Sequence, residues 1–251
     1  MKLSEILSEK LKDLEMQGVM TDITYDCPKC RDTGMIVKEI DGMQFGMPCE
    51  CQTEKAYMRR LQKSGLAKLA EEKRLDNFCA DLPYQQRIKR TAAAYIADNG
   101  DRWFYIGGQV GCGKTHICTA IAVQLIRQGN PLRYMLWRDE ATGIKALACD
   151  AEKYKREIEK YKAVRVLYID DLFKGKVTEA DVNLAFEILN HRYNAGLRTI
   201  ISSEYQLSEL KTIDEAISSR ILEMSRGYRM DVRREDGRNF REHADQKKEE
   251  E

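Results

Sequence analysis

The sequence predicts an α/β fold: a parallel sheet with helices on both of its faces, preceded by a small cysteine-rich module. Two observations predict the sheet. From residue 102 onward, short apolar segments alternate with longer amphipathic segments, an order typical of parallel strands joined by helices. The first apolar segment also runs directly into the glycine-rich stretch GGQVGCGKT at 107–115. The module is predicted by four cysteines that lie among glycines and prolines between residues 25 and 52.

Apolar runs locate the strands and amphipathic runs locate the helices. The run VRVLYID is nearly continuous in apolar residues, as expected for a strand buried on both faces. Gly129 and Pro131 end the helix after the glycine-rich stretch, because proline cannot continue a helix. Strands are expected at 102–108, 132–137, 164–170, 198–204 and 228–233. Helices are expected at 3–17, in a basic segment at 52–74, before Gly100, at 114–128, at 138–162 as one or two helices, at 179–196 and at 213–225.

The composition narrows the class of protein. With 251 residues, the chain has room for one full domain and a small module. Its net charge of +1 does not by itself indicate nucleic-acid binding, so local clusters must be considered. A run of about 18 apolar residues, as a membrane span needs, is absent, and the amphipathic start lacks the apolar stretch of a secretion signal. We expect a cytoplasmic protein without membrane contacts, whose eight cysteines are reduced thiols or metal ligands.

The segment from Gly108 to Thr115 matches the pattern G-x-x-x-x-G-K-[ST] of a phosphate-binding loop, in the expected context between a strand and a helix. Glycines let the backbone curl so that several N–H groups point at phosphate oxygens, and the helix N-terminus adds partial positive charge. Lys114 is expected to reach the β- and γ-phosphates of ATP, and the Thr115 hydroxyl to bind Mg²⁺. The predicted nucleotide-binding residues are Gly108, Gln109, Val110, Gly111, Cys112, Gly113, Lys114, Thr115 and His116.

Two aspartates end the buried strand VRVLYIDDL. Ligands of open α/β sheets bind at the carboxyl ends of the strands, so Asp170 is the candidate ligand for Mg²⁺, partly through water. Asp171 is the candidate residue to orient the water that attacks the γ-phosphate. Many related ATPases use glutamate at this place. Aspartate is one methylene shorter, so hydrolysis is expected to be slow or to depend on a neighbouring subunit.

Over residues 75–241 the chain resembles AAA+ ATPases, and among them the DnaC/DnaI-type helicase loaders of bacteria and phages and the related IstB-type transposase helpers. The resemblance rests on FYIGGQVGCGKTHICTAIA, VLYIDDLF, RTIISSEY followed by LSEL, and AISSRILEMS. It implies that Ser203 contacts the γ-phosphate, with Ser202 as the alternative, since Glu204 stands where loaders often have asparagine. It also implies that Arg220 acts as an arginine finger in an adjacent subunit, which requires self-association.

The four N-terminal cysteines have the spacing of a zinc site. Cys27 and Cys30 form a C-x-x-C pair, and Cys49 and Cys51 complete four thiolates that can hold Zn²⁺ at about 2.3 Å. An iron–sulfur cluster and free thiols are the alternatives. The stretch has little apolar material of its own, so metal binding should contribute much of its folding free energy. Similar knuckles open the DnaI-like loaders, whose N-terminal domain binds the replicative helicase.

Basic clusters are candidates for sequence-independent contacts to DNA phosphates. The clusters are Arg59, Arg60, Lys63, Lys68, Lys73 and Arg74, and Arg226, Arg229, Arg233, Arg234, Arg238 and Arg241. The alternative for each residue is an ordinary solvated helix face. The segment FKGK at 173–176 is a candidate for facing a DNA channel in an assembled ring. Cys79, Cys112, Cys118 and Cys149 are expected to be buried or incidental thiols, and Cys112, inside the phosphate loop, is also a candidate for sensitivity to oxidation. The three histidines show no metal or catalytic spacing.

These features predict an ATP-dependent loader of a replicative DNA helicase onto single-stranded DNA, a weak ATPase in which hydrolysis is the release switch. The alternatives are a transposition helper ATPase and a zinc-containing, nucleotide-dependent adaptor with little hydrolysis. The expected organisation is a helix and zinc-binding module at 1–56, a basic helical linker at 57–76, an AAA+ ATPase domain at 77–241 and a disordered charged tail at 242–251. The expected cofactors are ATP, Mg²⁺ and Zn²⁺.

Overall fold

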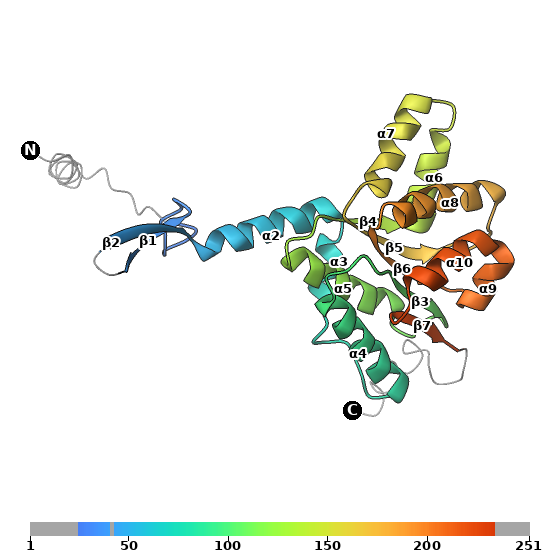
Figure 1. Ribbon diagram of the computed structural model, residues 1–251, viewed down its shortest axis with the longest axis horizontal. Coiled ribbons are helices and arrows are strands. Elements are labelled where there is room, and N and C mark those ends of the chain that lie inside the picture. Colours follow the sequence, from blue (N-terminus) through green and yellow to red (C-terminus); the bar gives the residue numbers. More distant parts are fainter. Residues whose placement is uncertain (1–24, 41–42, 234–251) are drawn as a thin grey trace, which may run out of the picture. The chain divides into compact units, whose positions relative to one another are not determined.

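The computed structural model describes residues 25–40 and 43–233. The helix expected at 3–17, the tail expected at 242–251 and the three most C-terminal arginines of the second basic cluster lie outside these residues. The chain divides into two compact units, Met1–Ala56 and Tyr57–Glu251, and each is described by itself (Figure 1).

The first unit contains an antiparallel hairpin that the sequence analysis did not expect. Strands β1 (Met35–Ile40) and β2 (Met43–Pro48) pair in a register that places Met35 opposite Pro48. The hairpin joins two cysteine-bearing turns: Cys27 and Cys30 precede β1, and Cys49 follows β2. Every residue of β2 is exposed, so apolar burial does not stabilise this hairpin. Its short strands lack the buried face that makes a strand visible in a sequence pattern.

The second unit is built on a five-stranded sheet in which each neighbouring pair is parallel. The strand order is β4-β5-β6-β3-β7, and the five expected strands are all present. Their bounds are β3 (Phe104–Gly108), β4 (Leu132–Leu136), β5 (Val166–Leu172), β6 (Arg198–Ser203) and β7 (Arg229–Val232). After β3, which lies between β6 and β7, the chain crosses to β4 at the far edge of the sheet. Such a change in the direction of strand order opens a crevice beside the carboxyl end of β3.

The helices largely follow the expected segments. Their bounds are α2 (Glu50–Ser64), α3 (Ala67–Glu72), α4 (Pro83–Ala97), α5 (Lys114–Arg127), α6 (Trp137–Ala146), α7 (Ala151–Lys162), α8 (Glu179–Asn194), α9 (Leu207–Ile213) and α10 (Glu215–Met224). Gly65, with φ of +84°, interrupts the basic segment that was expected as one helix. The short helix α9 was not expected. Asp214 separates it from α10, since its Oδ1 accepts a hydrogen bond from the N–H of Ile217 at 2.7 Å and caps α10.

Two hydrophobic cores cover the two faces of the sheet. Phe104 and Ile106 point into the core formed with α3, α4 and α5, whereas Trp103 and Tyr105 point into the core formed with α6 to α10. The alternation of these neighbours along one segment is the side-chain period of a strand. Figure 1 shows the helices on both sides of the sheet. The structure thus confirms the predicted fold class of a parallel sheet covered by helices.

Candidate functional site

A cavity of about 270 Å³ lies at the carboxyl end of β3. The expected phosphate loop forms much of its wall, and the ends of β5 and β6 contribute three acidic or basic side chains. The lining residues are Lys73, Phe78, Cys79, Gln85, Val110, Gly111, Cys112, Gly113, Lys114, Thr115, His116, Asp171, Lys174 and Glu204. The cavity therefore collects residues from four separate parts of the sequence.

The phosphate loop has the backbone that its glycines permit. Gly113, with φ of +91°, precedes the first residue of α5, so the helix N-terminus points at the cavity. A Cβ on Gly108 would lie 1.9 Å from the carbonyl oxygen of Val232, which excludes any other residue there. The Lys114 ammonium is buried and donates to the carbonyl oxygens of Gly108 at 2.9 Å and Gln109 at 2.7 Å. Phosphate oxygens can replace these carbonyls as acceptors.

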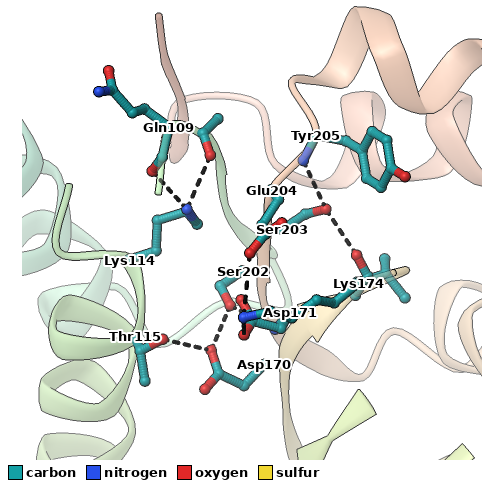
Figure 2. A network of polar contacts seen from close by, with 12 residues as sticks. Gln109, Lys114, Thr115, Asp170, Asp171, Lys174, Ser202, Ser203, Glu204 and Tyr205 are labelled. Atoms are coloured by element: carbon teal, nitrogen blue, oxygen red, sulfur yellow. Dashed lines mark hydrogen bonds and ion pairs between the residues drawn. The ribbon is translucent and has the colours of Figure 1, made fainter. Parts of the chain in front are cut away.

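Asp170 is the centre of a buried polar network (Figure 2). Its Oδ1 accepts from the hydroxyls of Thr115 at 3.2 Å and Ser202 at 2.5 Å, and its Oδ2 accepts from the hydroxyl of Tyr134 at 3.1 Å. Burial raises the pKa of Tyr134, so this hydroxyl stays protonated and donates. A carboxylate and a hydroxyl side by side at the end of the phosphate loop suit Mg²⁺, which prefers oxygen ligands. Thr115 and Asp170 are therefore the residues that fit a metal bound with the nucleotide.

Asp171 is held in an unusual conformation beside this network. Its φ is +58°, in the left-handed region that a non-glycine residue rarely adopts. Its N–H donates to the Ser202 hydroxyl at 2.9 Å, which ties the strained residue to the Asp170 network. Its Oδ2 lies 2.7 Å from the ammonium of Lys174, which also lies 3.2 Å from Glu204. Strain of this kind is commonly found at functional sites.

The wall of the cavity away from the strands comes from the segment before α4. The Phe78 ring meets the His116 ring edge-on, with 5.3 Å between centroids. His116 Nε2 lies 2.8 Å from the carbonyl oxygen of Arg74 and 3.0 Å from Oδ1 of Asn77. Burial lowers the pKa of His116, so this side chain is neutral at pH 7. The sequence analysis missed Phe78. An aromatic residue in a turn-rich segment is its only sign in the sequence.

The four predicted zinc ligands come together in the first unit. Their sulfur atoms all lie within 4.8 Å of one another. Cys27 Sγ lies 3.7 Å from Cys49 Sγ, and Cys30 Sγ lies 3.5 Å from Cys51 Sγ. Four sulfurs at 2.3 Å around a tetrahedral zinc ion would be about 3.8 Å apart, close to these separations. A hydrogen bond from the Cys30 backbone lowers the pKa of Cys27 to about 7, which makes a thiolate available near neutral pH. The four residues fit a zinc ion.

Comparison with known proteins decides the family. The model of the family described as IstB-like ATP binding protein matches residues 10–226. The chain belongs to this family. Two proteins of Bacillus subtilis (strain 168) are similar to this IstB-like chain. The phage-like element PBSX protein XkdC is 30% identical over 218 residues, covering 81% of each chain, and the uncharacterized protein YqaM is 28% identical over 262 residues, covering 83% of each chain.

Solved structures share the fold of the IstB-like chain. A DnaC helicase loader has a TM-score of 0.57 at 23% identity, covering 67% of this chain and 99% of that one. A DnaI structure has a TM-score of 0.54 at 18% identity, covering 68% and 93%. A replication initiator DnaA bound to AMPPCP and single-stranded DNA has a TM-score of 0.57 at 20% identity, and this chain spans 55% of its length. These likenesses confirm the predicted fold class and a resemblance in fold to helicase loaders.

The structure separates the two candidate serines of the IstB-like chain. The hydroxyl of Ser202 joins Asp170 and Asp171. The hydroxyl of Ser203, the first choice from the sequence, instead donates to the carbonyl oxygen of Leu172 at 2.9 Å and makes no hydrogen bond with Asp170. Successive residues of a strand point to opposite faces of the sheet, so Ser202 and Ser203 of β6 face different sides. An assignment that is wrong by one position therefore selects a side chain on the wrong face. Of the two serines, Ser202 is therefore the one that contacts Asp170.

Arg220 does not line the nucleotide cavity of its own chain. It lies on α10, where its guanidinium donates to Asn190 Oδ1 at 3.1 Å and to the Ala216 carbonyl oxygen at 2.9 Å. Its guanidinium also lies over the rings of Phe186 at 4.9 Å and Tyr193 at 5.6 Å. A position outside the cavity is compatible with action on a neighbouring subunit. That role stays a prediction.

The basic segments are less uniform than expected. Lys73 lines the nucleotide cavity, Arg74 pairs with Asp76 at 3.0 Å, and Arg60 donates to the Ile126 carbonyl oxygen at 3.3 Å. The expectation that FKGK faces a channel is wrong for its first residue, because Phe173 is buried with its ring 5.5 Å from that of Trp137. Within the described ranges 25–40 and 43–233, no helix has the length and apolar character needed to cross a bilayer.

Proposed function

We propose that this protein is an ATP-dependent loader of a replicative DNA helicase onto single-stranded DNA, with hydrolysis acting as the release switch. One observation carries the proposal: a single chain of the IstB-like family combines a cavity walled by the phosphate-loop sequence with a four-thiol module. The fold shared with a DnaC helicase loader supports it. The similarity to a protein of a phage-like element supports a phage or prophage setting.

Each residue of the cavity has a proposed role. Lys114 binds the β- and γ-phosphates, and Thr115 and Asp170 hold the magnesium ion, which supplies positive charge at the transferring phosphoryl group. Asp171 orients the attacking water, and Ser202 holds Asp170 and Asp171 in register. Arg220 completes the cavity of an adjacent subunit and makes the ATPase depend on self-association.

The module has a structural and a binding role in this proposal. Zinc on Cys27, Cys30, Cys49 and Cys51 holds the hairpin β1–β2, and the surface of residues 1–56 binds the helicase. The remainder of the proposed organisation is a segment 57–76 that leads into the ATPase domain at 77–241, followed by the tail at 242–251. Single-stranded DNA is bound by the assembled ATPase domains.

Binding of ATP in the cavity is tested by titrating the purified chain with ATP in the presence and absence of Mg²⁺. We expect magnesium-dependent binding that falls at least ~100-fold in Lys114→Ala, because the charge that faces the phosphates is lost. Isothermal titration calorimetry measures both affinities. The exposed Lys160→Ala on α7 is the matched control and should bind as the unmodified chain does. Unaltered affinity in Lys114→Ala would refute the assignment of the cavity.

The two serines on β6 give a second test. We expect Ser202→Ala to reduce the ATPase rate about tenfold or more, because Asp170 and the backbone of Asp171 lose their common partner. Ser203→Ala should reduce the rate less than about threefold, since the Ser203 hydroxyl bonds the Leu172 carbonyl oxygen on β5 and the N–H of Tyr205 but not Asp170. Steady-state phosphate release, measured with helicase and single-stranded DNA present, distinguishes them. The reverse order of effects would restore Ser203 as the residue beside the γ-phosphate.

The partner decides between the loader and a second candidate, a transposition helper, which the IstB-like family match favours. Both functions use the same cavity residues. Pull-down from host lysate, with and without zinc chelation, separates them. Recovery of a hexameric helicase that is lost on chelation supports the loader, whereas recovery of a transposase supports the helper.

A further inference from the structure

Lys174 is placed in the nucleotide cavity by a tight turn after β5. The N–H of Lys174 donates to the Asp171 carbonyl oxygen at 3.0 Å and closes the turn. Asp171 and Phe173 both have positive φ, 58° and 63°, so the turn is strained at two non-glycine residues. Burial of the Phe173 side chain and the bond from Ser203 to the Leu172 carbonyl oxygen hold it in this form. The turn therefore presents Lys174 to the cavity at a defined place.

The ammonium of Lys174 bridges the two carboxylates of the cavity wall. It lies 2.7 Å from Asp171 Oδ2 and 3.2 Å from Glu204 Oε1, and all three residues line the cavity. The hydrogen bond that Lys174 donates to the Asp171 carboxylate raises the pKa of Lys174, so the lysine stays protonated. Without the Lys174 ammonium, the negative charges of Asp171 and Glu204 would be unpaired on the strand side of the cavity.

Those charges are on the side where a third phosphate must lie. Asp171 is adjacent to Asp170, the residue that fits the metal, and both are joined through Ser202. A γ-phosphate carries about two negative charges near neutral pH, and like charges a few ångströms apart in a partly desolvated site repel strongly. A diphosphate does not reach this position, so it meets less of that repulsion.

We propose that Lys174 is a positioning residue that neutralises Asp171 and Glu204 and so allows the cavity to accept a triphosphate in preference to a diphosphate. The inference rests on the proposed ATP site. It adds a determinant of nucleotide selectivity that lies outside the phosphate loop.

The exposure of Lys174 separates this role from a structural one. Its side chain is 43% exposed, and partly exposed ion pairs contribute little to stability. Its removal should therefore leave the melting temperature nearly unchanged while it alters nucleotide affinity. A lysine that only fixed the turn would show the opposite pattern.

The test compares Lys174→Met with the unmodified chain for binding of a non-hydrolysable ATP analogue and of ADP, both with Mg²⁺, by calorimetry. We expect affinity for the triphosphate to fall about tenfold and affinity for ADP to fall less than about twofold. The double variant Lys174→Met with Glu204→Gln should recover most of the lost affinity, because one carboxylate is then neutral. Lys176→Met, an exposed lysine two residues on, is the control and should change neither affinity.

The outcomes distinguish failure of the inference about Lys174 from failure of the proposed function. If the unmodified chain binds no nucleotide, the proposed function fails. If it binds and Lys174→Met loses ATP and ADP affinity equally, or loses neither, the inference is overturned. Should Lys174→Met lower the melting temperature, Lys174→Arg decides: retained charge should preserve triphosphate affinity, and loss of selectivity in that variant would also overturn the inference.

Discussion

Replacing Arg192 by leucine should lower the free energy of unfolding of the second unit by roughly 4 kcal/mol, the largest effect that we expect from a single residue outside the nucleotide cavity. Arg192 lies on α8 and is fully buried. Burial lowers the pKa of its guanidinium to about 9, which still leaves it protonated at pH 7. A buried charge is tolerated only when hydrogen bonds replace its water.

Carbonyl oxygens and one hydroxyl provide that replacement. Nη1 of Arg192 donates to the carbonyl oxygens of Tyr161 at 3.0 Å, Lys162 at 3.2 Å and Val164 at 2.8 Å. Nη2 donates to the Arg198 carbonyl oxygen at 2.6 Å, and Nε to the Thr199 hydroxyl at 3.0 Å. The carbonyl oxygens of Tyr161 and Lys162 belong to the last turn of α7, where helical partners are missing. Leucine at position 192 would remove the donor that they share.

Denaturation in urea, followed by circular dichroism, measures the effect of Arg192→Leu. Arg165→Leu is the matched control, since Arg165 is exposed and precedes β5 nearby in the fold. We expect the control to change the free energy of unfolding by less than about 0.5 kcal/mol. Equal effects of the two substitutions would show that the buried hydrogen bonds of Arg192 contribute nothing beyond the loss of a charge.

Replacing Cys30 by serine should remove zinc from the first unit and unfold its hairpin. Among the described residues of this unit, Cys27, Cys30 and Cys49 form a small buried cluster, with Ile36 and Cys51 partly buried beside it. We therefore expect metal binding to supply most of the free energy that holds β1 and β2 together. Zinc content should fall from about one ion per chain to near zero, since three thiolates leave the tetrahedral site incomplete.

Metal analysis and limited proteolysis measure these two effects. We expect new cleavage sites between residues 25 and 56 in Cys30→Ser and in the chelated protein, with the melting temperature of the second unit unchanged. Cys149→Ser, an exposed cysteine, is the control and should keep its zinc. Full zinc content in Cys30→Ser would contradict the four-thiol site. Iron in place of zinc, with visible absorption, would instead support the iron–sulfur alternative.

The strands of the second unit were predictable because burial on both faces leaves a continuous apolar run, as in VRVLYID. The hairpin β1–β2 was not predictable, because every side chain of β2 is exposed and no alternation of buried and exposed side chains marks the strand. Helix α9 was missed for a related reason. It has seven residues, too few for the 3.6-residue period to stand out.

The sequence by itself determined the phosphate loop, the two aspartates near the end of β5 and the four thiols, since each of these is a short motif whose chemistry is local. Only the tertiary structure decided that Ser202 rather than Ser203 faces Asp170, and that Lys174 bridges Asp171 and Glu204. Both facts depend on the lateral pairing of β5 with β6 and on its irregularity after Ile169. Contacts across a parallel sheet join residues about thirty positions apart, and no local pattern in the chain records their register.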